Sequence, residues 1–467
     1  MGFGIPVLLV FANYVLAVAT HDISSDEELF ALPRSIVLHL HTSSLTKKLG
    51  QPLPDLDPWL PLILTIIYEL LRGKDSPWAP YLHLLATRFD TLMFWSEEEL
   101  GQLKGSQVLE KIGKEAAEAE WRHTIIPIML EHPALFPTVA ESHEEKTNEL
   151  THLAHRAGSL IMTCAFDINK EESNEAGKEN SDAESYLVSD DEDDDTFKGM
   201  VPFADLLNAD ADRNNARLFQ EDNYLIMRST APIKAGEQIF NDYGPLPRSD
   251  LLRMYGFITP NYAQYDVVEL SNQDITAAAQ NTKKEISTSQ RNGMAALDEL
   301  GLLEDSYIIQ RAPHDCVKLV DAIPTELHML LRALTCNLGN DASSIEKRFR
   351  KGVKNDVTIE EASLLASVCT KRLTDYPTTA EQDDALLEKL EAPSNISPCR
   401  FEMAIQVRKG EKEILHNIIK ICQDHITRRM SEIQAASTAT KRKHEGERGR
   451  STEKQKLLKK SKKEGFR

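Results

Sequence analysis

Two short segments, residues 200–210 and 239–257, hold the polar and aromatic side chains that could carry out chemistry. The first contains Asp205 and Asn208. The second contains Asn-Asp-Tyr-Gly at 241–244 and Tyr-Gly-Phe at its end. Carboxyl, amide and phenol groups can bind a substrate, orient it and exchange protons with it. Each segment alone also has a structural explanation, as a turn or as core aromatics, so the combination carries the argument.

In this order and spacing, the two segments resemble the SET-domain protein lysine methyltransferases, in the branch with a C-terminal Rubisco-methyltransferase-type substrate-binding domain. That branch includes fungal ribosomal-protein lysine methyltransferases and the animal SET-domain-containing protein 6. The resemblance covers roughly residues 16–435, with supporting matches at 26–34, 76–78, 94–95 and 158–162. It implies an α+β fold, in which a SET β-fold with a helical insert is followed by an all-α substrate-binding domain.

The resemblance implies that a methyl group passes from S-adenosylmethionine (SAM), the expected cofactor, to a lysine ε-amine. At pH 7 an amine with a pKa of about 10.4 is mostly protonated, and its deprotonation costs roughly 4–5 kcal/mol. A narrow channel that excludes water lowers this cost because it disfavours the ammonium form. Cofactor and peptide that enter from opposite faces would align the reacting atoms.

The same resemblance assigns roles to individual residues. Tyr243 would be the catalytic tyrosine, with its hydroxyl orienting the amine and the methyl group and its ring facing the sulfonium. The other expected cofactor-binding residues are Asn208, Ala209, Tyr255, Phe257, Cys164, Gly2 and Gly4. The expected substrate-binding residues are Trp78, Ala165, Asp167 and Asp205. No metal site is expected, because His39 and His41 share a strand face without a third ligand nearby.

The sequence departs from the family pattern at three places, and two of them, Cys164 and the glycine loop, motivate a rival hypothesis. Ala209 stands where the family usually has histidine, Cys164 replaces a larger residue, and the glycine loop expected before Val18 is missing. Gly2-Phe3-Gly4-Ile5 would supply that loop if Pro6–Ala17 were absent, so we interpret Pro6–Ala17 as an inserted segment. The rival is a catalytically inactive SET-fold module that binds a basic ribosomal or nuclear partner.

The apolar N-terminus has a further alternative explanation, a signal peptide or a membrane anchor. Residues 2–20 carry no charge, and Ala17-Val18-Ala19 resembles a signal-peptidase site. However, no Lys or Arg precedes the apolar run, and the run is shorter than the roughly 20 residues that span a bilayer. A buried strand is therefore the preferred interpretation, and no membrane partner is expected.

The composition is globular, but the charge is unevenly distributed. The 467 residues are 41% hydrophobic and 27% charged with a net charge of −19, which excludes full disorder and argues against a nucleic-acid coat. Residues 171–195 carry 12 acidic residues against one lysine, and residues 441–467 carry 12 Lys and Arg against four acidic residues. The basic tail would be a nuclear import signal, a ribosome or RNA tether, or a solvated tail. Specific nucleic-acid recognition is not expected, since no aromatic residue precedes Phe466 in it.

Composition and periodicity divide the chain into five parts. Residues 1–45 would be the first part of the SET domain, 46–198 the helical insert, 199–260 the second part with the catalytic motifs, 261–435 the helical substrate-binding domain and 436–467 a disordered basic tail. Within the insert, residues 168–198 would form a disordered acidic loop, either solvated or docking a basic partner. The six cysteines include no C-x-x-C pair, so free thiols are expected.

The resemblance implies an enzyme that adds one methyl group to a lysine of a basic protein, and we expect it to be a monomer. The expected substrate is a 60S ribosomal protein, with a histone-like nuclear protein as the alternative. The basic tail favours the nucleus, with the cytoplasm as a second compartment.

Overall fold

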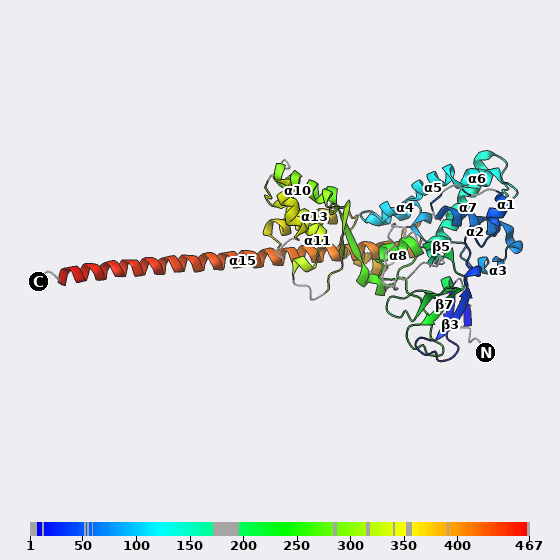
Figure 1. Cartoon of the computed structure of the whole chain (residues 1–467), viewed down its shortest axis with the longest axis horizontal. Helices are drawn as coiled ribbons and strands as arrows, with labels where there is room; N and C mark the ends of the chain where they lie inside the picture. Colours follow the sequence, from blue (N-terminus) through cyan, green and yellow to red (C-terminus); the bar gives the residue numbers. More distant parts are fainter. Residues whose placement is uncertain are drawn as a thin grey trace. The chain divides into compact units, whose positions relative to one another are not determined.

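The computed structural model describes the chain except for residues 1–6, 12–13, 51–52, 54–55, 58, 171–195, 284–286, 314–317, 340, 352–356, 390–391 and 465–467. The chain forms two compact units (Figure 1). Unit 1 comprises Met1–Asp266 and Leu386–Val407, and unit 2 comprises Val267–Ala385 and Arg408–Arg467. This division differs from the expected one because Leu386–Val407 belongs to the first unit.

Unit 1 contains a three-stranded antiparallel sheet in the order β3 (Glu28–Pro33), β7 (Tyr224–Ser229) and β6 (Ala216–Gln220). The predicted hairpin is confirmed, since β6 and β7 pair directly across the turn at residues 221–223. Leu225 and Met227 of β7 are fully buried in the core of this region. The chain folds back at the polar turn because pairing of β6 and β7 buries these apolar side chains on one face of the sheet.

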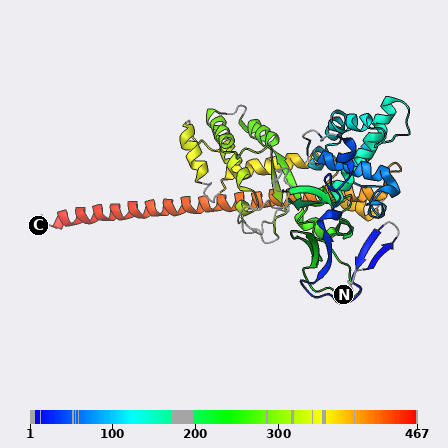
Figure 2. The same cartoon turned by 45° about the vertical axis from the view of Figure 1, so that its right-hand side comes forward.

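The apolar N-terminal segment forms strands, as expected. β1 (Val7–Phe11) and β2 (Tyr14–Val18) pair as a separate antiparallel hairpin (Figure 2). Its last residues join the SET core, where the carbonyl of Ala17 accepts a hydrogen bond of 2.8 Å from the amide of Ile239. The proposed insertion of Pro6–Ala17 stays a prediction. None of the described helices is long and apolar enough to cross a membrane.

Between residues 45 and 164 the described chain is mainly helical (Figure 1). The helices of this part are α1 (Leu45–Leu49), α2 (Trp59–Arg72), α3 (Ala79–Leu82), α4 (Glu97–Leu100), α5 (Lys114–His123), α6 (Ile125–Glu131) and α7 (His143–Cys164). The long α7 begins at a reciprocal capping box between Ser142 and Glu145, which satisfies its first amides. It packs on α2, whose side chains Ile63, Ile66 and Ile67 are buried.

Two paired strands follow α7 and frame the acidic segment. β4 (Ala165–Asn169) and β5 (Thr196–Met200) are antiparallel, and Asn169 pairs with Thr196. The expected disordered loop of residues 168–198 is therefore too long at both ends, because apolar Ile168 and Phe197 pair within the strands. Residues 171–195 lie outside the described part of the chain.

The remaining elements of unit 1 are short, apart from the start of the last helix. α8 (Arg248–Tyr255) follows the second motif, and α15 (Pro398–Glu464) begins in this unit. Arg400 of α15 forms ion pairs with Asp90 at 2.9 Å and with Glu99 at 2.7 Å. The 3₁₀ helices of unit 1 are Arg34–Ile36, Gly73–Asp75, Leu92–Phe94, Gly101–Leu103, Gln107–Lys111, Ala204–Leu206 and Pro260–Tyr265.

Unit 2 is mainly helical, and it also contains a two-stranded sheet that the sequence did not predict. The strands are β8 (Val267–Ser271) and β9 (Ser306–Gln310). The helices are α9 (Asn272–Lys283), α10 (Thr288–Glu299), α11 (Thr325–Thr335), α12 (Ala342–Arg350), α13 (Ile359–Leu373), most of α14 (Ala380–Lys389) and α15, with a 3₁₀ helix at Leu319–Asp321. α15 continues to Glu464, where a disordered tail was expected from residue 436. The segment has the propensity for this, since it is rich in Lys, Arg and Glu and contains no proline.

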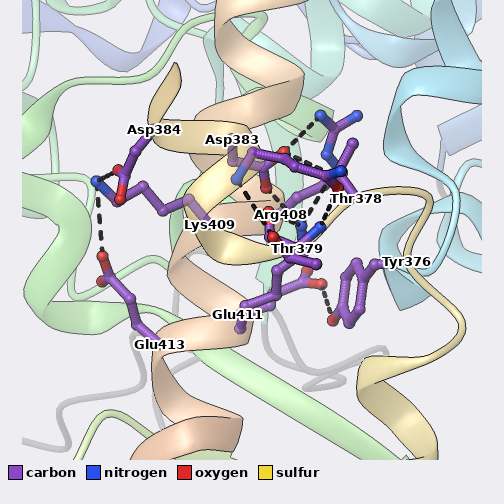
Figure 3. A network of polar contacts seen from close by, with 11 residues as sticks. Tyr376, Thr378, Thr379, Asp383, Asp384, Arg408, Lys409, Glu411 and Glu413 are labelled. Atoms are coloured by element: carbon purple, nitrogen blue, oxygen red, sulfur yellow. Dashed lines mark hydrogen bonds and ion pairs between the residues drawn. The ribbon is translucent and has the colours of Figure 1, made fainter. Parts of the chain in front are cut away.

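A buried charge network in unit 2 joins α14 to α15 (Figure 3). The carboxylate of Asp383 accepts hydrogen bonds from Arg408 at 2.9 Å and from Lys412 at 2.5 Å, and each of these three side chains is at most 1% exposed. Beside them, the hydroxyl of Tyr376 donates to Glu411 at 2.6 Å. Opposite charges compensate one another in this network, as buried charges require.

Candidate active site

The fold brings the two predicted motif segments together. The amide of Asn241 donates to the carbonyl of Asn208 at 2.8 Å, and Ala209 pairs with Asn241 in a parallel bridge. Asn215 supports the second segment, because its side chain accepts from the amide of Phe240 at 2.8 Å and donates to the carbonyl of Gln238 at 3.0 Å. Two loops about thirty residues apart therefore form one site, as their spacing predicted.

Tyr243 lies at the centre of an aromatic cluster. Its ring stacks on Tyr255 with ring centroids 4.4 Å apart and an angle of 17° between planes, and Tyr255 meets Phe257 edge-on at 6.4 Å. The Tyr243 hydroxyl donates to the carbonyl of Leu207 at 3.3 Å. Tyr243, which was expected to be catalytic, and the two aromatic residues expected at the cofactor therefore form one cluster.

Gly256 is the residue that permits this arrangement. It ends α8 in the left-handed conformation, with φ of 74°. A Cβ atom added there would lie 2.7 Å from the backbone nitrogen of Thr91. Any other residue would be strained by its own backbone and would clash with a neighbouring backbone atom. Glycine therefore holds Tyr255 and Phe257 where the chain turns beside Tyr243.

Asp205 supplies the carboxyl group of the site. It lies in the 3₁₀ helix Ala204–Leu206, and its Oδ2 accepts a hydrogen bond from the hydroxyl of Tyr81. Its other oxygen, Oδ1, is buried and has no hydrogen-bond partner among the residues described. Burial raises the pKa of Asp205 to about 8, although the bond from Tyr81 acts in the opposite direction. The carboxyl group can therefore exchange a proton near neutral pH.

The neighbouring groups stay protonated. Burial, and then the charge of Asp205, raise the pKa of the Cys164 thiol to about 12. Burial raises the pKa of Tyr243 well above its ordinary value, with Tyr255, Cys164 and Asp205 adding to the effect. Tyr243 therefore acts through its neutral hydroxyl, as a hydrogen-bonding group rather than as a phenolate.

The structure places the remaining expected residues differently. The Trp78 indole donates to the carbonyl of Ile36 at 2.9 Å, and the side chain lies in the core of the helical insert. Trp78 therefore has a structural position, because a buried indole needs a partner and has one there. Half-buried Ala165 opens β4, and the exposed Asp167 pairs with Lys198 at 2.8 Å. Gly2 and Gly4 lie outside the described residues.

Two contributors were missed from the sequence, Tyr81 and Asn215. Tyr81 follows the Ser76-Pro77-Trp78 match by three residues and reaches Asp205 across 124 positions. The available signal was the place of Tyr81, a polar residue one helical turn after a recognised match. No local pattern, however, specifies Asp205 as its partner. In the part of the chain that is described, no group of three or more His, Cys, Asp or Glu could hold a metal ion.

The residues present fit SAM and a lysine side chain. The half-buried stacked rings of Tyr243 and Tyr255 suit a sulfonium or ammonium cation, because the ring faces are negative. The buried Oδ1 of Asp205 is an acceptor that a lysine amine can satisfy. The fold and the site therefore define a methyltransferase of the SET class, in which two loops that are distant in the sequence meet.

Comparison with known proteins agrees with this class. Residues 15–244 match the SET domain family, and residues 281–415 match the Rubisco LSMT substrate-binding family. Ribosomal lysine N-methyltransferase 4 from Saccharomyces cerevisiae is 32% identical over 400 residues, which cover 77% of this chain and 76% of that protein. N-lysine methyltransferase SETD6 from Mus musculus is 31% identical over 430 residues, or 86% and 83% of the two chains.

A solved structure of Rubisco LSMT bound to AdoMet shares the fold, with a TM-score of 0.63, 24% identity and coverage of 91% of this chain and 89% of that one. The chain belongs to the SET-domain protein lysine methyltransferases with a Rubisco LSMT-type substrate-binding domain. It is a protein-lysine N-methyltransferase that uses SAM. The comparisons favour the enzyme over the rival inactive module.

Proposed function

We propose that this chain adds one methyl group to a lysine of a basic protein of the 60S ribosomal subunit. The observation that carries the lysine assignment is the buried, unpartnered Oδ1 of Asp205 beside Tyr243. The ribosomal assignment draws on the relative from Saccharomyces cerevisiae, which is named a ribosomal lysine N-methyltransferase. The net charge of −19 suits a basic partner, because opposite charge raises the rate of encounter.

The site's own groups would prepare the amine for transfer. When bound, SAM supplies an electrophilic methyl group on a positively charged sulfur. The carboxylate form of Asp205 receives a proton of the substrate ammonium on Oδ1. The amine is then neutral, and Asp205 is a neutral carboxylic acid. The Tyr243 hydroxyl orients the amine, and the Tyr255 ring excludes water from it. We assign a single methyl group from the resemblance to the fungal ribosomal-protein lysine methyltransferases.

The reaction is tested with the purified chain, tritiated SAM and separated 60S proteins, with core histones as a competing substrate. We expect label on one lysine of one ribosomal protein and a single methyl group by mass spectrometry. The Tyr243→Phe variant serves as the inactive control. Label on histones with none on 60S proteins would overturn the ribosomal assignment, and a trimethylated product would overturn the single transfer.

We also propose that the chain acts as a monomer in the nucleus, with the basic residues of 441–467 as the import signal. Clustered lysine and arginine residues are the type that import receptors bind. A fluorescent fusion is expected in the nucleus and should move to the cytoplasm when residues 441–467 are deleted. Nuclear fluorescence of the truncated chain would contradict the proposal, and light scattering of the purified chain tests the monomer.

A further inference from the structure

Tyr81 contacts the site from outside both motif segments. It lies on the four-residue helix α3 of the helical insert, and its side chain is 8% exposed. Its ring belongs to the hydrophobic core of the insert, while its hydroxyl donates to Oδ2 of Asp205. The ring and the hydroxyl therefore serve different purposes, because only the hydroxyl reaches the reacting region.

The hydrogen bond makes the two oxygens of Asp205 unequal. Oδ2 is held by Tyr81, and Oδ1 is buried with no partner in the described chain. A buried acceptor without a partner costs about 1–3 kcal/mol. Such a cost persists where a ligand supplies the missing donor. A fixed carboxyl group with one free oxygen is a directional acceptor, and rotation of the group would lose that direction.

No charged residue of the chain completes the carboxyl group. Tyr81 is the side chain that bonds to Asp205, and no lysine, arginine or histidine among the described residues pairs with it. The groups that sense its charge are Tyr81 itself on α3, Cys164 on α7 and Tyr243 in the second motif. All three are neutral, so the carboxylate form of Asp205 has no cation partner among the described residues, and a ligand cation would stabilise that form.

We propose that Tyr81 is a positioning residue for methyl transfer, whose hydroxyl fixes the Asp205 carboxyl group so that Oδ1 meets the amine of the target lysine. This inference rests on the proposed lysine methylation, which it deepens. It extends the site from the two motif segments to a third, the helix α3. It also predicts that the Tyr81 hydroxyl acts on the protonation of Asp205, a property that a purely structural tyrosine would not change.

The direction of that effect follows from the hydrogen bond. Burial raises the pKa of Asp205, and the hydroxyl of Tyr81 lowers it by stabilising the carboxylate. Tyr81→Phe removes the donor and keeps the ring, so the pKa of Asp205 should rise further. The carboxylate form, which accepts the proton of the substrate, would then appear only at higher pH. The acid limb of the kcat/KM profile should move upward with it.

Tyr376→Phe in unit 2 is a matched control. Tyr376 is 6% exposed, and its hydroxyl also donates to a carboxylate, that of Glu411 at 2.6 Å (Figure 3). Both variants thus remove one buried hydroxyl from a carboxylate partner. Only Tyr81→Phe alters a carboxyl group of the site. Comparison of the two variants therefore separates the effect of losing a buried hydroxyl from the effect of losing the fixed position of the Asp205 carboxyl group.

The first measurement is the dependence of kcat/KM on pH for the ribosomal substrate. We expect Tyr81→Phe to raise KM for the protein about tenfold, to shift the acid limb upward by about one pH unit, and to leave the Kd for SAM within about twofold. Tyr376→Phe should match the wild type in all three. An acid limb that does not move in Tyr81→Phe, or that moves equally in Tyr376→Phe, overturns the inference.

The second measurement needs no substrate. Infrared difference spectra between the wild type and Asp205→Asn identify the carboxyl band of Asp205, and its titration is then compared in Tyr81→Phe. A titration that rises in Tyr81→Phe supports positioning even where the ribosomal protein is not methylated, and in that case only the ribosomal substrate is wrong. An unchanged titration overturns the positioning role whatever the substrate proves to be.

Discussion

Two carboxyl groups, one in each unit, meet the cost of lying away from water in opposite ways. Asp383 in unit 2 is held by the cations Arg408 and Lys412, and the three side chains are closed to solvent. Asp205 in unit 1 has one neutral hydrogen-bond donor and one unpartnered oxygen. A carboxylate held by cations stays ionised when it is buried, whereas a carboxyl group without a cation can take a proton or accept a donor from a ligand. The partners of the two groups therefore distinguish them: two cations hold Asp383, and one hydroxyl holds Asp205.

The largest expected effect is on the free energy of unfolding, when the carboxylate of Asp383 is removed. Asp383→Asn leaves Arg408 and Lys412 buried without their counter-charge, so the free energy of unfolding should fall by about 3–5 kcal/mol. All four tryptophans of the chain lie in unit 1. Tryptophan fluorescence therefore follows unit 1, and far-ultraviolet circular dichroism follows both units during unfolding in urea.

The adjacent residue provides the control for Asp383→Asn. Asp384 pairs with Lys409, and the Asp384 side chain is 52% exposed. Asp384→Asn should change the free energy of unfolding by less than about 1 kcal/mol, because exposed ion pairs contribute little. Equal losses in the two variants would show that the buried network is no more important than a surface pair.

The next effect is on catalysis. Tyr243→Phe removes the hydroxyl that would orient the amine, and turnover should fall by about 100-fold. The melting temperature should stay unchanged, because the aromatic stack with Tyr255 remains. Single-turnover kinetics with saturating SAM measure the transfer step directly. Turnover within about threefold of the wild type would show that Tyr243 is not the catalytic tyrosine.

Asp205→Asn should behave unlike Asp383→Asn. At pH 7 a carboxyl group with a pKa of about 8 is mostly neutral, so the amide resembles the form already present. The unfolded wild type gains stability at pH 7 by ionising Asp205, and the amide cannot ionise. We therefore expect Asp205→Asn to raise the free energy of unfolding at pH 7, and kcat/KM to fall about tenfold. Asp222→Asn in the exposed β6–β7 turn is the control. A loss of stability as large as that of Asp383→Asn would remove the contrast between the two carboxylates.

The smallest effect is on the pH dependence of stability. The folded pKa of Asp205, about 8, lies above the ordinary value of about 3.9, so the stability it contributes is full below about pH 4 and is lost as the pH rises towards 8. Glu361 in unit 2 is the opposite case. Burial opposes its ionisation, but hydrogen bonds from His328 and Arg332 lower its pKa to about 2.

Stability from Glu361 is therefore present above about pH 4.3 and lost as the pH falls towards 2. The melting temperature, followed by tryptophan fluorescence, should fall by a few degrees between pH 5 and pH 8 because Asp205 ionises more readily in the unfolded chain. Asp205→Asn should flatten this slope, whereas Glu361→Gln should leave it unchanged. A slope that persists in Asp205→Asn would assign it to other groups.

The sequence predicted most of what is local in this molecule. The family resemblance of the segments that hold Asn208 and Tyr243 implied one site, and the fold brings the two segments together through the bridge between Ala209 and Asn241. The β6–β7 hairpin was predictable because a polar turn separates two apolar runs that are adjacent in the sequence.

Contacts between distant segments were not predictable. Tyr81 meets Asp205 across 124 positions, and nothing near either residue encodes the other. Strands β8 and β9 are separated by two helices, so a helical period dominated that region. Trp78 was expected at the substrate, but a tryptophan in a recognised motif can also belong to the hydrophobic core. Its hydrogen-bond partner, the carbonyl of Ile36, lies 42 positions away, so the sequence near Trp78 does not show which position it takes.

The pairing of Asn169 with Thr196 has a consequence for protein engineering and for evolution. Paired strand residues lie about 5 Å apart, so the two ends of the connection between β4 and β5 lie close together. A guest domain whose own ends are close together could be inserted there without moving Cys164 or Met200. Doubling the length of such a connection costs only about 0.6 kcal/mol. The composition and length of this segment can therefore change between species while the methyltransferase core stays constant.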